Sequence, residues 1–144
     1  MNIIVQRLRT PLWWRWVVLP LSYTLLCVPF FWQTFATWSR DLATRCQGRC
    51  DSGWENVWSL WWVAHQLQMG QSPFYTDQMF YPHGADLFWQ ILMFANGVLM
   101  TPVTLMWGPV FAFNLLALIS FVASGWAMAL CAEQIVGHRW AAWI

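Results

Sequence analysis

The sequence predicts an all-α membrane protein with two transmembrane helices, joined by a long extracytoplasmic loop that carries amphipathic and juxtamembrane helices. Hydrophobic residues make up 59% of the 144 residues and charged residues only 9%, whereas a soluble domain carries about 25% charged residues. Two stretches long enough to cross a bilayer contain no charged residue. The 14 tryptophans exceed what two interfacial belts normally need. We therefore expect a lipid bilayer around the chain and some indole rings lining a surface or pocket.

The charge distribution excludes nucleic acid as a partner. The formal net charge is +1, and the seven basic residues do not form a cluster large enough to make a basic face. Binding to a polyanion requires such a face, because neutralisation of phosphates supplies most of its affinity.

The first predicted membrane helix belongs to residues 1–38. No charged residue occurs from Trp16 to Phe35, and a helix of this length is about 30 Å long, which matches the hydrocarbon core of a bilayer. Three arginines precede it, so we expect a cytoplasmic amino terminus. A cleaved signal peptide is the alternative, but the run is too long and lacks a small-x-small cleavage site. We interpret it as a signal anchor, bent or loosened at Pro20 and Pro29.

Residues 39–108 hold most of the acidic residues and are predicted to form an extracytoplasmic loop. Ser52 and Glu55 have the spacing of a capping box, and Gly70 is a helix terminator. These signals predict an amphipathic helix over residues 53–69.

One face of the predicted helix 53–69 is rich in aromatic side chains. The apolar face contains Trp54, Val57, Trp58, Trp61, Trp62, His65 and Met69, and a polar stripe beside it contains Glu55, Ser59 and Gln66. Such a helix lies on a membrane surface or packs against membrane helices.

The segment 88–107 is apolar and long enough to cross the membrane, but polar and helix-breaking residues interrupt it. They are Gln90, Asn96-Gly97 and Thr101-Pro102. If this segment and the next apolar stretch both crossed, Arg139 would lie outside, whereas a single crossing leaves it in the cytoplasm, as the positive-inside bias favours. We expect a broken re-entrant or juxtamembrane helix here, with a full crossing as the alternative.

Residues 109–133 are predicted to form the second transmembrane helix. Its small-xxx-small pairs are Ser120 and Ser124, Ala123 and Ala127, and Gly125 and Ala129. Because such pairs allow helices to approach closely, we expect further transmembrane helices, of the same protein or of partner subunits, as neighbours. Residues 134–144 are expected to form a cytoplasmic turn and the start of a further span, as in the front of a longer protein.

The four cysteines occur in two contexts. Cys27 and Cys131 lie in apolar runs and are expected to be small buried hydrophobic residues. Cys46 and Cys50 lie in a polar stretch, where an extracytoplasmic location would favour a disulfide between them. A zinc site is the alternative, but no second Cys or His pair with metal-ligand spacing accompanies them.

Asp51 and Glu55 are the candidate catalytic residues. A carboxylate at the boundary of water and membrane can take a proton from an acceptor hydroxyl or hold a divalent cation. Asp51 lies just outside the predicted helix, and its alternative role is that of a solvated loop acid. Glu55 has a structural alternative, because its carboxylate could accept a hydrogen bond from the Ser52 amide in the capping box.

Several other residues are candidates for lining a pocket: Trp54, Trp58, His65, Tyr75, Tyr81 and His83. The tryptophans could anchor and pack the helix, or offer a surface for sugar rings or isoprenoid tails. His65 could be a base, a ligand such as the axial ligand of a porphyrin-type pigment, or a ring buried among tryptophans. His83 lies in "YPHG" and could be a turn residue or a ligand.

The motifs after Asp51 resemble the front of bacterial multi-spanning glycosyltransferases of the GT-C type, akin to protein mannosyltransferases. The resemblance runs from about Asp51 to the end of the chain, is strongest up to Gly84, and rests on the Asp at the loop start, "GQSPFYT" and "YPHG". It implies a plasma-membrane enzyme that takes a sugar from a polyprenyl-phosphate carrier. The implied catalytic base or metal-placing acid is Asp51, with Glu55 as a second candidate and a divalent metal as the cofactor.

The resemblance also has a gap. The later spans and loops that complete such a site are absent from these 144 residues, so the chain alone would be an incomplete enzyme. The alternative function is a non-catalytic integral membrane accessory subunit of a larger complex, pigment-associated if His65 is an axial ligand.

Overall fold

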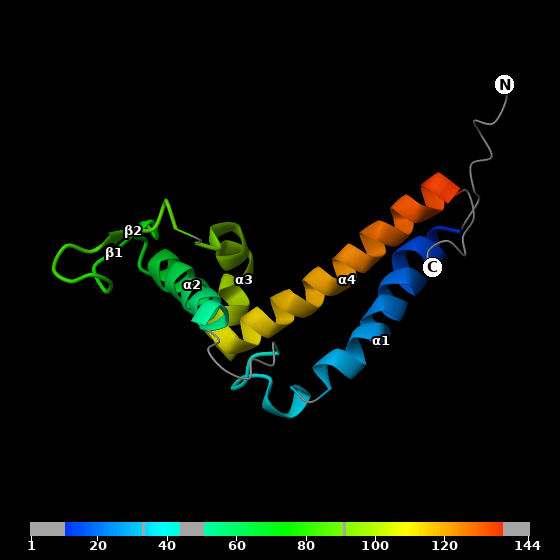
Figure 1. Cartoon of the computed structure of the whole chain (residues 1–144), viewed down its shortest axis with the longest axis horizontal. Coiled ribbons are helices and arrows are strands. Elements are labelled where there is room, and N and C mark those ends of the chain that lie inside the picture. The colour runs from blue at the N-terminus through cyan, green and yellow to red at the C-terminus, as the bar shows by residue number, and fades with distance from the viewer. Residues whose placement is uncertain (1–10, 33, 44–50, 91, 137–144) are drawn as a thin grey trace, which may run out of the picture. The chain divides into compact units, whose positions relative to one another are not determined.

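A computed structural model of the chain describes residues 11–32, 34–43, 51–90 and 92–136 (Figure 1). These residues form four α-helices, as the predicted all-α class requires, and a very short β-hairpin that was not predicted. The chain folds into two compact units. The first consists of Met1–Trp32 and Leu118–Ile144, and the second of Gln33–Ala117.

The first unit contains α1 (Leu19–Phe31) and most of α4 (Pro109–Val136). Within the described residues, Trp14–Phe31 and Pro109–Val136 are the two helical stretches long and apolar enough to cross a membrane. Both correspond to predicted spans. At 1.5 Å per residue α4 is about 42 Å long, which exceeds the hydrocarbon thickness of a bilayer.

Pro20 changes the helix geometry where the first apolar stretch begins. In a regular α-helix its ring would clash with the carbonyl group four residues earlier. The Leu19 amide instead donates to the Trp14 carbonyl, five residues back, and the turn widens into the π-helix η1 (Trp14–Val18). This confirms the predicted loosening at Pro20.

The first apolar helix ends earlier than predicted. It was expected to reach Phe35, but α1 ends at Phe31, two residues after Pro29. Pro29 has no amide hydrogen to bond the preceding turn, which weakens the helix at this point. Phe35 begins a separate 3₁₀-helix, η2 (Phe35–Thr37).

Side chains at the start of α1 and on the later turns of α4 form the core of the first unit. Leu19 and Ala129 are buried at its centre, with Trp14, Tyr23, Trp126 and Leu130 packed around them. A Cβ atom at Gly125 would lie 2.7 Å from Cδ1 of Tyr23, so glycine is needed for this approach. The pair Gly125 and Ala129 therefore packs against α1, as small-xxx-small pairs do.

The second unit is built on the packing of α2 (Asp51–Gln68) against α3 (Phe94–Trp107). Its main core cluster comprises Leu60, Met100, Ala112 and Leu116, of which the last two lie on the first turns of α4. Gly97 of α3 faces Val63 of α2, and a Cβ atom at Gly97 would lie only 2.7 Å from Cβ of Val63. Glycine thus allows the two helices to approach closely.

The start and the buried face of α2 differ from the prediction. The helix begins at Asp51, so Ser52 lies inside the first turn and not at the predicted capping position. Ser59 and Gln66 were assigned to an outer polar stripe, but both are buried, whereas Trp54 is exposed. The reason is that α3 packs on the side of the helix that carries Leu60, which the aromatic periodicity did not indicate.

The segment 88–107 is helical only in its second part. Residues 88–90 form turns, and α3 begins at Phe94 and contains Pro102. With 14 residues α3 is about 21 Å long, too short to cross a bilayer. The polar interruption therefore shortens the helix to one that packs on α2.

Between α2 and α3 the chain forms a β-hairpin of β1 (Tyr75–Thr76) and β2 (Ala85–Asp86). The strands are antiparallel, with Tyr75 opposite Asp86 and Thr76 opposite Ala85. Gly84 has a φ of 69°, and a Cβ atom there would lie 2.8 Å from the Thr76 carbonyl oxygen, so glycine is required at this position.

Candidate functional site

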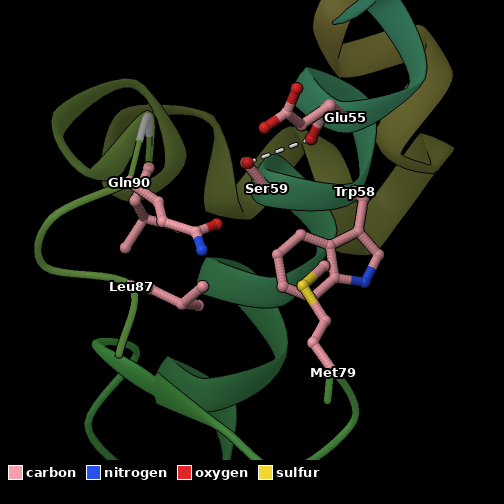
Figure 2. A pocket seen from close by; sticks show the side chains of 7 residues that line it. Glu55, Trp58, Ser59, Met79, Leu87 and Gln90 are labelled. Atoms are coloured by element: carbon pink, nitrogen blue, oxygen red, sulfur yellow. Dashed lines mark hydrogen bonds between the residues drawn. The ribbon is translucent and has the colours of Figure 1, made fainter. Parts of the chain in front are cut away.

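The candidate site lies at the beginning of α2, where both predicted catalytic acids occur. Asp51 is the first residue of α2 and Glu55 follows one turn later. Glu55 is exposed and lines a depression with Trp58, Ser59, Met79, Leu87, Gln90 and Leu92 (Figure 2). The helix therefore supplies one wall, and the hairpin together with the segment after it supplies the other.

The depression is small. Its volume is about 20 Å³. A space of this size holds about one ordered water. By itself the depression is too small to enclose a sugar ring.

The tryptophan side of the depression is held rigidly. The Trp58 ring stacks on Trp62, with ring centroids 5.5 Å apart and an interplanar angle of 8°. Trp62 is buried, and its indole Nε1 donates a hydrogen bond of 2.9 Å to the Pro73 carbonyl. This bond orients the stacked pair, so Trp58 presents a fixed indole surface to the depression.

Three polar side chains border the depression, and the donor of one of them is already used within the helix. The Ser59 hydroxyl donates to the Glu55 backbone carbonyl at 3.0 Å. Figure 2 shows the Gln90 amide directed into the space opposite Trp58, with the Glu55 carboxylate above it. Glu55 and Gln90 are exposed. They offer a carboxylate and an amide, which together can bind hydroxyl groups.

Of the predicted pocket residues, Trp58 lines this depression. Trp54 is exposed, and Tyr81 is 87% exposed. The Tyr75 hydroxyl donates to the His83 carbonyl at 3.1 Å, and so these two residues stabilise the hairpin. The residues that line the depression do not include Trp54, His65, Tyr75, Tyr81 or His83.

His65 packs against tryptophans, as its structural alternative predicted, but it is not fully buried. Its ring stacks on Trp61, with centroids 5.2 Å apart and an interplanar angle of 10°. The ring is half-buried, and Trp62 lies on another side with a centroid distance of 6.4 Å.

Five lining residues were not predicted: Ser59, Met79, Leu87, Gln90 and Leu92. Ser59 could have been found, because it lies one turn after Glu55 on the same helix. The other four reach the depression only because the hairpin brings the chain back to α2, and no local pattern indicates that return.

The described residues do not provide a metal site. No group of three or more His, Cys, Asp or Glu side chains comes together among them. The metal role of Asp51 stays a prediction, and we derive no step through a metal. The predicted disulfide of Cys46 and Cys50 lies outside the described residues.

The other two cysteines are unpaired. Cys27 is half-buried, but Cys131 is exposed on α4, contrary to its prediction as a buried residue. The reason is that Cys131 lies on a different side of the helix from Ala129, which packs against α1.

A second polar group lies in the first unit and was not predicted. The Arg15 Nε donates to Glu133 Oε2 at 3.1 Å, and the Glu133 side chain is 1% exposed. The Trp126 indole donates to the Arg15 carbonyl at 2.7 Å. The beginning of the first apolar helix and the end of α4 are thus joined by polar contacts.

Comparisons with known proteins add no relative. No protein-family model, curated protein or solved structure matches this chain.

Proposed function

We propose that the chain forms part of an integral membrane glycosyltransferase that moves a sugar from a polyprenyl-phosphate carrier to a hydroxyl acceptor. The observation that carries the proposal is that the exposed Glu55 carboxylate lies beside the fixed Trp58 ring. Glu55 follows Asp51, the first residue of α2, by one helical turn. An acid beside an aromatic surface is suited to a reaction in which a sugar ring is held and an acceptor hydroxyl loses a proton.

The helices support the membrane part of this proposal. Two helical stretches are long and apolar enough to cross a bilayer. Arg15 near the start of one contacts Glu133 near the end of the other, as expected for antiparallel spans whose connecting loop lies on a single side of the membrane.

In the proposed reaction, Asp51 removes the proton from the acceptor hydroxyl. The acceptor oxygen then forms a bond to the anomeric carbon of the sugar, while the bond from that carbon to the carrier phosphate breaks and the phosphate leaves with the electron pair. A single displacement of this kind inverts the anomeric configuration. Glu55 is the second candidate for the base, and the Trp58 ring and the Gln90 amide contact one edge of the sugar.

The test replaces each acid without changing its size. Membranes from cells that express the protein are assayed for transfer of labelled mannose or glucose from the corresponding polyprenyl phosphates. We expect Asp51→Asn to lower transfer about a hundredfold or more, because an amide cannot accept the proton. Glu55→Gln should lower it less, and Asp77→Asn, an exposed acid of the hairpin outside the depression, should leave it unchanged. Full transfer by Asp51→Asn at normal expression would contradict the proposed role of Asp51.

A non-catalytic accessory subunit is the second candidate function. The observation that favours it is on α4, where Ser120, Ser124, Ala123 and Ala127 are exposed although they form two small-xxx-small pairs. Purification in mild detergent would then yield a stable complex with other membrane proteins and no transferase activity. An absorption band in the visible range that disappears in His65→Ala would support a pigment-associated subunit with His65 as the axial ligand.

A further inference from the structure

We propose that the β-hairpin and the turn after it form a membrane-interface anchor that inserts aromatic side chains into a neutral or zwitterionic bilayer. The anchor consists of Phe80, Tyr81, Phe88 and Trp89. It goes beyond the proposed function but rests on its membrane part, the insertion of the two apolar helices.

The exposure of these four side chains is the first observation. Their exposed fractions are 73%, 87%, 66% and 85%, respectively. All four lie within ten residues of one another, and the Phe88 and Trp89 rings contact edge to face with centroids 5.3 Å apart. Single exposed aromatic residues are ordinary, but four large ones so close together indicate an interaction surface.

The backbone holds the rings outward. Phe80 has a φ of 55°, a conformation that bulky residues rarely adopt, and its carbonyl accepts a 3.0 Å hydrogen bond from the His83 amide. At the other end of the hairpin, the Phe88 amide donates to Asp86 Oδ1 at 2.8 Å. The Phe88 ring is also supported from behind by Phe74, at a centroid distance of 6.0 Å. The exposed rings therefore project from a hairpin whose backbone is fixed by hydrogen bonds.

The chemistry of the surface favours a bilayer interface as the partner. Tyr and Trp combine an apolar ring with a polar group and concentrate where headgroups meet acyl chains, and Phe inserts below them. The sequence has no Lys or Arg between Arg49 and Arg139, and the nearest charged residues are Asp77 and Asp86. An anionic surface would be repelled, so the fitting partner is a neutral or zwitterionic one.

Chain connectivity keeps the hairpin close to the bilayer. Trp89 is separated from α4, a candidate span, by four connecting residues, the 14-residue α3 and Gly108. Even with the connections fully extended, this stretch covers at most about 45 Å. An aromatic surface tethered within that distance of a membrane meets lipid at a high effective concentration.

The experiment measures membrane depth by fluorescence quenching in the full chain, reconstituted in phosphatidylcholine vesicles. The four native cysteines are replaced by alanine, and one cysteine is introduced for an NBD label by Phe80→Cys, Trp89→Cys or, as the matched control, Gln71→Cys. Gln71 is exposed and polar and lies before the hairpin. Nitroxide groups near the lipid headgroups should quench the labels at 80 and 89 about threefold more strongly than the control label.

A second variant tests the aromatic contribution itself. Tyr81→Asp combined with Trp89→Asp should lower the quenching of the label at 80 to the control level, and both side chains are exposed enough for the fold to tolerate the change.

Equal quenching at all three positions, in a chain that resists alkaline carbonate extraction, would overturn the anchor alone. Release of the chain by carbonate would overturn the membrane part of the proposed function as well. Labels at 80 and 89 that are protected from aqueous iodide but not quenched by lipid nitroxide would indicate a protein partner, and would also overturn the anchor.

Discussion

Asn114 shows how one buried polar residue organises a segment that has little regular structure. Its Nδ2 donates to the Trp38 and Asp41 carbonyls, each at 2.8 Å, and its Oδ1 accepts from the Ala43 amide at 2.9 Å. The side chain is fully buried. The segment 38–43 consists of turns and bends, and these three hydrogen bonds connect its backbone to α4.

Replacing this residue should destabilise the second unit. Asn114→Ala would remove three part-buried hydrogen bonds between α4 and the segment 38–43, which we expect to cost about 3 kcal/mol. The measurement is equilibrium unfolding by SDS in mixed detergent micelles, with Gln68→Ala, an exposed polar residue at the end of α2, as the control. A change of similar size in both variants would contradict this role.

At this scale, residue type was predictable from the sequence but partners were not. Glu55 and Trp58 were recognised because both are contained in one local helical pattern. Asn114 gave no signal, because its partners lie more than 70 positions away in the sequence. The Gln90 amide reaches the depression only through the hairpin. Local periodicity contains no information about such returns of the chain.

The helices were predictable in position, and less so in orientation. Runs without charge identified both candidate spans to within a few residues, because burial in lipid selects composition over the whole segment. The buried side of α2 was predicted only in part, because Val57 and Trp62 are buried but Trp54 is exposed. Tryptophans can cover either a partner helix or an open surface. Ser59 and Gln66 show the outcome, as both are buried although they belong to the predicted polar stripe.

The ion pair between Arg15 and Glu133 is expected to stabilise the packing of the first apolar helix against the end of α4. Arg15→Met would leave the buried Glu133 carboxylate without its cation, which we expect to cost about 3 kcal/mol. Removing both charges, by Arg15→Met with Glu133→Leu, should restore most of the stability, because no buried charge then remains unpaired.

The comparison is made by the same SDS unfolding, as a double-mutant cycle with both single variants. Arg15 is 30% exposed, so water moderates the effect on that side. Additive losses in the double variant would mean that the two residues do not act as a pair.

For the whole molecule, the contact of Arg15 with Glu133 bears on the proposed membrane topology. Among the described helices, α3 is too short to cross a bilayer, so the proposed topology has one crossing on each side of the loop. Two crossings return the chain to its original side, and the contact between the outer ends of the two helices fits that arrangement. The sequence also predicts two crossings. The segment 88–107 is interrupted by polar residues, and a third crossing there would place Arg139 outside.

This arrangement predicts which positions a membrane-impermeant thiol reagent reaches in intact cells. With the native cysteines replaced by alanine, Ser72→Cys should be labelled from outside, because it is exposed in the loop, and Gln134→Cys only after the membrane is opened. The exposed position of each side chain ensures that a lack of labelling reflects the membrane and not burial. Labelling of both cysteines from outside would contradict two crossings. It would require a third crossing, and α3 would have to be part of it. Labelling of Ser72→Cys only from the cytoplasm would put the Asp51 end of α2 on the wrong side for a carrier sugar presented outside, and the proposed transfer would fail with it.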